Sequence, residues 1–354
     1  MLRGDSVPSF KHDRVTPAQI IILGFLLLIF TGAVLLMLPF STQEPGGASF
    51  GDALFTATSA TCVTGLVLHD TALYWSPFGQ LVILLLIQVG GMGVVTIAVA
   101  IFMFAGKRIG LKQRWVMQES ISAPQVGGIV RMTGFILKTA FLIEGIGALL
   151  LALRFCPQFG LGRGLWYAVF HSVSAFCNAG FDLMGVNSPF SSLTDYVGDP
   201  LVSNVIAFLI IIGGVGFLTW NDIREHKLHF RRYRLQSKLI LTTTLALILT
   251  GLLFFLLYEF EQGQWVDMSL WERINAAFFQ SVTPRTAGFN TVDLTGLSQP
   301  AQLLIILLML VGGSPGSTAG GFKTTTLAVM LLGIRAVFRH KERPQCFGRR
   351  IADE

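Results

Sequence analysis

Three short segments of the sequence share residue types and a spacing that suit cation coordination. They read FTATSATCVTGL (Phe55–Leu66), FHSVSAFCNAGF (Phe170–Phe181) and FFQSVTPRTAGF (Phe278–Phe289), and each has a glycine at its eleventh position. A bare cation entering hydrocarbon loses its hydration at a large free-energy cost. A ring of backbone carbonyl groups can replace the lost water without a fixed charge that would trap the ion. Glycine reaches the unusual backbone conformation that aims such carbonyls at no steric cost.

One copy of this motif is unspecific, but three copies at matched positions predict an ion filter. The candidate filter positions are the three residues that end in each glycine, and we expect K⁺ at these positions as the one bound metal ion: Val63, Thr64, Gly65, Asn178, Ala179, Gly180, Thr286, Ala287 and Gly288.

The composition indicates a protein that lipid surrounds. Apolar residues make up 52% of the 354 and charged residues 13%, whereas soluble domains carry about 25% charged residues. The mean hydropathy is +0.64. Runs of about 20 apolar residues can cross a bilayer as helices, and we expect spanning helices at Pro17–Phe40, Pro77–Ala105, Met132–Phe155, Pro200–Trp220 and Leu239–Tyr258, with a broken sixth at Pro300–Phe338.

These elements form three repeats of spanning helix, short helix, turn and second spanning helix. The short segments Asp52–Thr61, Gly164–Phe176 and Leu270–Val282 are about half as long as a crossing requires. We therefore expect them to enter the membrane and return, which is tolerated where protein or water surrounds the backbone. A second glycine signature follows each turn: VGGMG (Val89–Gly93), IGGVG (Ile212–Gly216) and VGGSPG (Val311–Gly316).

The distribution of charge predicts how the chain is oriented. Of the 26 Lys and Arg residues, 20 fall in the N-terminal tail and in three later stretches. Cytoplasmic loops carry such an excess, so we expect a multi-pass protein with its N-terminus in the cytoplasm. The predicted organisation is a tail (1–17), repeat one (18–106), a linker (107–131), repeat two (132–222), a linker (223–238), repeat three (239–338) and a second tail (339–354). Lipid headgroups, rather than nucleic acid, are the expected partners of the basic linkers, and a docking surface for a cytoplasmic protein is compatible with this.

The glycine-rich break in the last apolar run is a candidate gate. Five glycines and a proline would cost a helix several kcal/mol, so segment 312–323 is expected to be a loop within the membrane. A kinked helix that packs closely on a neighbour is the alternative. Lys323 is costly at this depth and should face the pore or a partner. The candidate gate residues are Gly312, Gly313, Ser314, Gly316, Ser317, Thr318, Gly320, Gly321 and Lys323.

Other polar residues allow two interpretations each. Glu144 either lines an ion path or forms a hydrogen bond in the packing. His171 and Arg285 flank the candidate filter, and we expect Arg285 to brace it by pairing with a carboxylate. Three acidic residues shortly after the filter glycines form either an acidic vestibule that concentrates cations or an ordinary solvated surface: Asp70, Asp182 and Asp293.

Several classes of function lack their motifs in this sequence. The four cysteines show no metal-ligand spacing and no disulfide framework. There is no phosphate-binding loop, so the chain is expected to need no cofactor of its own. The metalloprotease motif HExxH is absent from the sequence, and we do not expect an enzyme.

The sequence resembles the Trk/Ktr/HKT superfamily of potassium transporters, and within it the KtrB-type membrane subunits of bacterial Ktr systems. The resemblance rests on SATCVTGL, HSVSAFCNAGF, VTPRTAGFN and GGSPGSTAGGFKTTT (Gly312–Thr326). It implies an all-α fold of M1–P–M2 units around a pseudo-fourfold pore in the bacterial plasma (inner) membrane. It also implies that the nine filter positions bind K⁺, that Gly65 favours K⁺ over Na⁺, and that segment 312–323 acts as the gate.

The same resemblance implies partners and one departure from the family pattern. It implies K⁺ uptake by a homodimer on a cytoplasmic nucleotide-binding ring (KtrA-like), with Na⁺ stimulating or accompanying transport. A fourth repeat is expected soon after the last basic stretch, and the sequence ends at Glu354 without one. The expectation is therefore a shortened form of a longer protein, or a pore whose fourth wall another chain supplies. The alternative function is a non-conducting remnant or assembly protein of the same fold.

Overall fold

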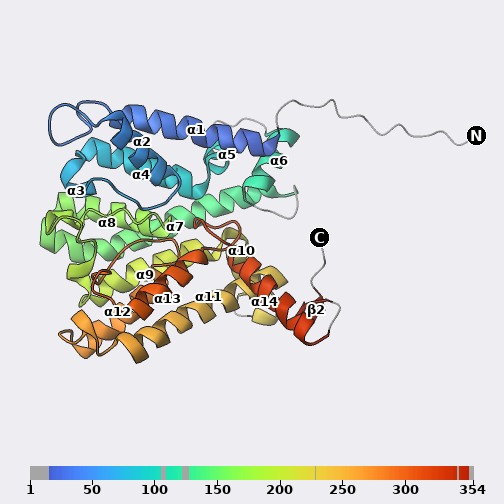
Figure 1. Cartoon of the computed structure of the whole chain (residues 1–354). Helices are drawn as coiled ribbons and strands as arrows, with labels where there is room; N and C mark the ends of the chain where they lie inside the picture. Colours follow the sequence, from blue (N-terminus) through green and yellow to red (C-terminus); the bar gives the residue numbers. More distant parts are fainter. Residues whose placement is uncertain (1–15, 105–108, 122–126, 228, 341–342, 351–354) are drawn as a thin grey trace, which may run out of the picture.

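The computed structural model describes residues 16–104, 109–121, 127–227, 229–340 and 343–350. Parts of the predicted tails and of the linker 107–131 lie outside these ranges. The three predicted repeats follow one another across the molecule, from blue through green to orange and red (Figure 1). Apart from one two-stranded hairpin, the regular structure described is helical, which confirms the predicted fold class.

The first repeat contains five helices, and a sixth helix follows in the linker. Thr16 begins α1 with a capping box, in which its hydroxyl accepts from the Gln19 N–H and the Gln19 side chain accepts from the Thr16 N–H. Such reciprocal bonds satisfy N–H groups that would otherwise have no partner. The elements are α1 (Pro17–Leu36), α2 (Phe50–Thr61), α3 (Thr71–Tyr74), α4 (Pro77–Met92), α5 (Val94–Phe104) and α6 (Leu111–Ser120).

The second repeat has the longest helix and the same order of elements. Its helix α7 packs against the half-length helix α8, which ends at the second predicted turn. The elements are α7 (Ile129–Phe159), α8 (Leu161–Phe176), η1 (Met184–Val186), η2 (Thr194–Tyr196), α9 (Pro200–Val215), α10 (Phe217–His226) and η3 (Phe230–Arg232).

The third repeat differs in having a long irregular segment between its last two helices. Its first helix ends in a π-helical turn, η4, and the chain closes in an antiparallel hairpin of β1 and β2. The elements are α11 (Leu235–Phe254), η4 (Phe255–Glu259), η5 (Gly263–Trp265), α12 (Leu270–Val282), α13 (Gln299–Leu310), α14 (Thr324–Phe338), β1 (Gln345–Cys346) and β2 (Arg349–Arg350).

Two predicted spanning helices are wrong as continuous helices. Within the described residues, α1, α7 and Leu235–Glu259 are long and apolar enough to cross a membrane as single helices. The run predicted over Pro77–Ala105 instead bends by 98° between α4 and α5, and Pro200–Trp220 bends by 94° between α9 and α10. Each bend is at a glycine with positive φ, Gly93 at +85° and Gly216 at +96°. Glycine adopts such backbone angles without a steric penalty, so the helix can stop and restart there.

The core lies around the half-length helices rather than around the long ones. Fully buried aromatic side chains of repeat two, including Phe170, Phe176 and Phe181, pack in one cluster with Phe289 of repeat three. The long helix α1 instead exposes large apolar side chains such as Leu23 and Leu27, each about 70% exposed. An exposed apolar face of this extent fits a lipid environment. The burial therefore centres the fold on the three turns.

Candidate ion filter and gate

Each half-length helix ends in a turn with the same alternating backbone. Helices α2, α8 and α12 lead into the first, second and third turns. In each turn the first and third candidate residues have positive φ and the second does not: Val63 (56°) and Gly65 (78°), Asn178 (57°) and Gly180 (72°), Thr286 (72°) and Gly288 (89°). Non-glycine residues rarely adopt such angles, and they cluster at functional sites. In an ordinary strand, successive backbone carbonyls point to opposite sides. Alternation between positive and negative φ instead allows neighbouring carbonyls to point the same way.

The three turns meet although they lie more than 100 residues apart in the sequence. A Cβ atom added to Gly65 would lie 2.7 Å from the Ala179 carbonyl oxygen, and one added to Gly180 would lie 2.2 Å from the Ala287 carbonyl oxygen. A Cβ on Gly288 would meet the Cα of Gly180 at 3.6 Å. The first turn therefore adjoins the second and the second adjoins the third, and their close approach requires glycine at Gly65 and Gly180.

A hydroxyl group fastens each turn to the helix before it. Ser59 Oγ donates to the Leu66 carbonyl (2.7 Å), Ser174 Oγ to the Phe181 carbonyl (2.6 Å) and Thr283 Oγ1 to the Phe289 carbonyl (2.6 Å). In each case the acceptor is the residue that follows the filter glycine. Buried bonds of this kind fix a strained backbone in one conformation. We call Ser59, Ser174 and Thr283 the hydroxyl clasps.

The hydroxyl clasps were absent from the sequence-based site, although a signal for them exists. Each repeat has a Ser or Thr six or seven residues before an apolar residue that follows the glycine. The third repeat is one residue shorter between clasp and acceptor than the other two, so aligning the glycines alone hides the correspondence.

The second glycine signature lets the following helix approach the turn. A Cβ on Gly90 of α4 would lie 2.0 Å from the Thr61 carbonyl oxygen, and one on Gly213 of α9 would lie 2.0 Å from the Phe176 carbonyl oxygen. These carbonyls end α2 and α8. A side chain at either glycine would push the half-length helix away, so the signature sets the position of each turn.

The candidate gate is an irregular segment between α13 and α14, so the kinked-helix alternative does not hold. Gly312 and Gly313 donate their N–H groups to the carbonyls of Phe322 (3.0 Å) and Gly320 (3.0 Å), which folds the segment back on itself. The Ser314 Oγ and Thr324 Oγ1 atoms are 3.0 Å apart, and Ser317 Oγ donates to the Ser314 carbonyl. Gly316 and Gly321 have positive φ, at +62° and +77°.

This segment binds directly beneath the second turn. Thr318 Oγ1 donates to the Phe176 carbonyl (2.9 Å) and lies 3.2 Å from Asn178 Oδ1. Its backbone also bonds the bend between α9 and α10, where the Phe217 N–H donates to the Gly316 carbonyl at 2.7 Å. The Asn178 Nδ2 group in turn donates to the Arg285 carbonyl at 3.4 Å. One side chain thus joins the second turn, the third turn and the candidate gate.

A cavity of about 670 Å³ lies between the candidate gate and the first repeat. Its lining includes Thr61–Val63 of the first turn, Gly90–Gly93, and Gly316–Gly320 of the candidate gate, together with residues of α1 and α6. The cavity therefore brings a candidate filter segment and the candidate gate into one space.

The charged and polar neighbours of the turns hold the structure together. Lys323 folds back so that its Nζ donates to the Ala319 carbonyl (2.9 Å). Glu144 is buried and accepts from Gln88 Nε2 at 3.0 Å, as the packing interpretation predicts. His171 is fully buried; its Nδ1 lies 2.7 Å from the Tyr167 carbonyl, and its Nε2 accepts from the Leu183 N–H.

The predicted ion pair of Arg285 is wrong. Its guanidinium is buried, lies 3.5 Å from Thr244 Oγ1 and forms no ion pair within the described residues. The facing helix α11 presents a hydroxyl at this position rather than a carboxylate, so a motif-based guess about charge pairing fails here.

The three acids after the glycines do not form one cluster. Asp70 caps α3 and also accepts from the Phe190 N–H (2.8 Å), which ties repeat one to repeat two. Asp182 accepts from the Met184 N–H, and burial raises its pKa to about 6, with repulsion from Asp70 acting in the same direction. Asp293 instead bonds Thr295 within its own exposed loop. The structure therefore brings Asp70 and Asp182 together and leaves Asp293 apart.

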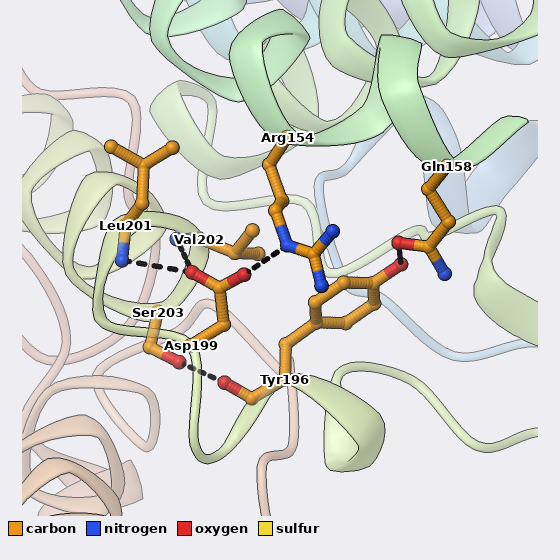
Figure 2. A network of polar contacts seen from close by, with 7 residues as sticks. All are labelled: Arg154, Gln158, Tyr196, Asp199, Leu201, Val202 and Ser203. Carbon is orange, nitrogen blue, oxygen red and sulfur yellow. Dashed lines mark hydrogen bonds and ion pairs between the residues drawn. The ribbon is translucent and has the colours of Figure 1, made fainter. Parts of the chain in front are cut away.

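A polar network braces the second repeat on the side where α7 ends. Figure 2 shows Arg154 of α7 pointing at Asp199, with 2.5 Å between Nε and Oδ2. Asp199 Oδ1 also accepts from the N–H groups of the second and third residues of α9, at 3.0 and 3.3 Å. Tyr196 donates to Gln158 and accepts from Ser203 through its carbonyl. The network fixes the start of α9 relative to the end of α7.

Metal-type ligands converge at one other place in the described chain. Asp222, Glu225 and His226 lie on α10 with ligand atoms within 4.8 Å of one another. Asp222 already accepts from the Arg234 N–H and from Ser237 Oγ, and lies 3.5 Å from Arg234 Nε. This arrangement gives Asp222 a structural role, since it anchors the start of α11.

Comparison with known families identifies the type of protein. Residues 7–353 match the family described as TrkH, cation transport protein. The chain belongs to the TrkH family. It is a membrane protein of a cation-transporting family, and the bent and half-length helices are the form that the M1–P–M2 unit takes in it.

Individual relatives agree with this assignment. The chain is 42% identical over 340 residues to the potassium/sodium uptake protein NtpJ of Enterococcus hirae, covering 96% of the chain and 74% of that protein. It is 43% identical over 342 residues to the Ktr system potassium uptake protein B of Bacillus subtilis, covering 96% and 75%. This TrkH-family chain thus spans about three quarters of these relatives, which supports the predicted resemblance to KtrB-type subunits.

A solved structure shows the shared fold. The potassium transporter TrkH from Vibrio parahaemolyticus superposes with a TM-score of 0.67 at 20% identity, over 93% of this chain and 64% of that one.

Proposed function

We propose that this chain takes up K⁺ across the plasma membrane as the ion-translocating subunit of a Ktr-type system. The observation that carries the proposal is the meeting of three glycine turns, each with the same alternating backbone and a hydroxyl clasp. Carbonyl groups in such turns can replace the water around a dehydrated cation. The nine candidate filter positions are the proposed K⁺ ligands and supports.

The second part of the proposal concerns the gate. The segment from Gly312 to Lys323 lies beneath the second turn, and the bonds of Thr318 hold it there. We assign it as a plug that leaves the ion path when these bonds open. The bend at Gly216 bonds the same segment through Phe217, so movement of α10 would reach the plug directly.

The proposed assembly follows the named relatives and the charge pattern. The Bacillus subtilis relative is named as part of a Ktr system. We propose a homodimer with its N-terminus in the cytoplasm, bound to a cytoplasmic nucleotide-binding ring, because the chain resembles the membrane subunits of such systems. The Enterococcus hirae relative is named for both potassium and sodium uptake. Na⁺ is therefore the proposed second ion that stimulates or accompanies K⁺ transport.

Uptake by cells that lack their own K⁺ transporters tests the function. Cells that express this chain with a ring subunit should accumulate K⁺ in a saturable manner, and Na⁺ alone should not replace it. The K⁺ content of the cells should then fall several-fold, to a low residual level, when the ring subunit is omitted. Accumulation of Na⁺ when it is supplied without K⁺, or no accumulation of K⁺ with the ring present, would contradict the proposal.

A further inference from the structure

A second cavity lies away from the turns and is lined by positive charge. It has a volume of about 810 Å³ and opens between the start of α7 and neighbouring parts of α5, α6 and α10. Four cationic side chains from three helices line it: Arg114, Arg131, Lys138 and Arg224. It shares none of its lining residues with the cavity beside the candidate gate.

Among the described residues, these four cations have no acidic partner. Glu225 lines an adjoining hollow together with Arg131 and Arg224, and its carboxylate accepts from Asn221 Nδ2 at 2.8 Å without an ion pair to either cation. The Arg114 Nε atom is buried and has no hydrogen-bond partner. Like charges that converge without compensation repel one another, so this cavity favours an anion.

Backbone N–H groups add to the same preference. Gly128, at φ +75°, precedes α7, and no side chain caps this helix of 31 residues. Gly128, Ile129, Val130 and Arg131 all line the cavity. The free N–H groups at a helix start, with the positive end of the helix dipole, bind phosphate oxygens well. A cationic cluster and an uncapped helix start therefore point at the same space.

The rest of the cavity lining is apolar, so a ligand that carries an apolar part as well as a negative charge fits it best. Met103 and Phe135 form part of the wall, and the Arg224 guanidinium lies 4.8 Å from the centre of the Phe135 ring. The cavity adjoins α7, a helix long and apolar enough to span the membrane. A soluble phosphate would leave the apolar wall uncovered, whereas a phospholipid offers both a phosphate and an acyl chain.

We propose that this cavity binds the headgroup of an anionic phospholipid from the membrane leaflet at the start of α7. The phosphate bonds the four cations and the α7 N–H groups, and the upper part of an acyl chain covers Met103 and Phe135. This site is separate from the proposed ion path, and its occupancy can be measured without transport.

The test compares lipid retention by purified full-length protein and by two variants. Native mass spectrometry counts the lipids that the protein retains from detergent micelles containing phosphatidylglycerol or phosphatidylcholine, with inorganic phosphate and ATP as soluble competitors. The double substitution Arg131→Gln with Lys138→Gln should weaken phosphatidylglycerol binding by about 30-fold, since each basic residue near an anionic lipid contributes a factor of about five. The matched control is Arg335→Gln, which removes one exposed cation of α14 that does not line the cavity.

The outcomes separate the possible occupants. Selective loss of phosphatidylglycerol from the double variant, with the control unchanged, supports the proposal. Equal retention of phosphatidylcholine, or equal retention by the double variant, overturns it. Displacement by inorganic phosphate or ATP at low concentration would also overturn it, in favour of a soluble anion. If the double variant does not fold, Arg224→Gln is measured in its place, with the same outcomes.

Discussion

The substitution Gly180→Ala tests the packing of the turns most directly. The new Cβ would lie 2.2 Å from the Ala287 carbonyl oxygen, and real Cβ atoms keep at least 3.0 Å, so that carbonyl must move by about 0.8 Å. Alanine at φ +72° also costs roughly 1 kcal/mol. A displaced carbonyl no longer serves as an ion ligand, and an interaction with a charged group contributes about 1.5–3 kcal/mol. K⁺ uptake should therefore fall between tenfold and a hundredfold.

Initial rates of K⁺ uptake, normalised to the amount of protein in the membrane, measure this effect. The control Gly145→Ala places a methyl group on exposed α7 of the same repeat, where nothing lies within 4 Å, and should leave uptake unchanged. Gly65→Ala should have an intermediate effect, because its Cβ would lie 2.7 Å from the Ala179 carbonyl. Uptake by Gly180→Ala equal to that of Gly145→Ala would refute the assignment of these turns as the ion path.

Three further predictions concern the gate, the brace and the outer acids. Thr318→Val removes the single hydroxyl proton that the Phe176 carbonyl and Asn178 Oδ1 share, an interaction of about 1 kcal/mol. K⁺ flux without the ring subunit should therefore rise about fivefold, and deletion of Gly313–Gly321 should raise it as well. Unchanged flux in both variants would exclude a gate. Asp199→Ala removes the cap of α9 and should lower the free energy of unfolding by about 1–2 kcal/mol. Asp199→Asn keeps the cap and should lower it less, because the partly exposed ion pair with Arg154 contributes little. Equal losses in the two variants would show that the cap is not the main contribution of Asp199. The raised pKa of Asp182 means that the folded state holds its proton up to about pH 6. The stability measured by thermal unfolding should therefore decrease as the pH rises from about 4 to 6. If Asp182→Asn shows the same dependence of stability on pH as the wild type, another group is responsible.

The positions of the helices could be predicted from the sequence better than the bends within them. The short helix predicted at Leu270–Val282 has those bounds in the structure, because Ser269 and Glu272 form a capping box and the chain must turn at the glycine that follows. The bends at Gly93 and Gly216 were not predicted, since an apolar run reads the same whether it is straight or broken. Glycine is compatible with both. At Gly216, a Cβ atom would lie 2.9 Å from the Pro315 carbonyl oxygen of repeat three, a contact that the apolar run does not reveal.

Side-chain partners in the site were harder to predict than its positions. The nine candidate filter positions rest on threefold repetition, which needs no knowledge of distance, and their role stays a prediction. The lack of a carboxylate beside Arg285 depends on which face of α11 packs against the third turn, and that packing is set by residues far away in the sequence. The hydroxyl clasps were missed because the third repeat is one residue shorter.

The position of Asn178 has a consequence for regulation. Its amide bonds the Arg285 carbonyl on one side and Thr318 on the other, so the same side chain belongs to the proposed filter and to the proposed plug. Binding of K⁺ at the filter and seating of the plug would share this side chain and would therefore be thermodynamically linked. Each would change the equilibrium constant of the other by the same factor. K⁺ would then act as an effector of its own transporter: the concentration of the transported ion would bias the plug, just as release of the plug would alter the affinity for the ion.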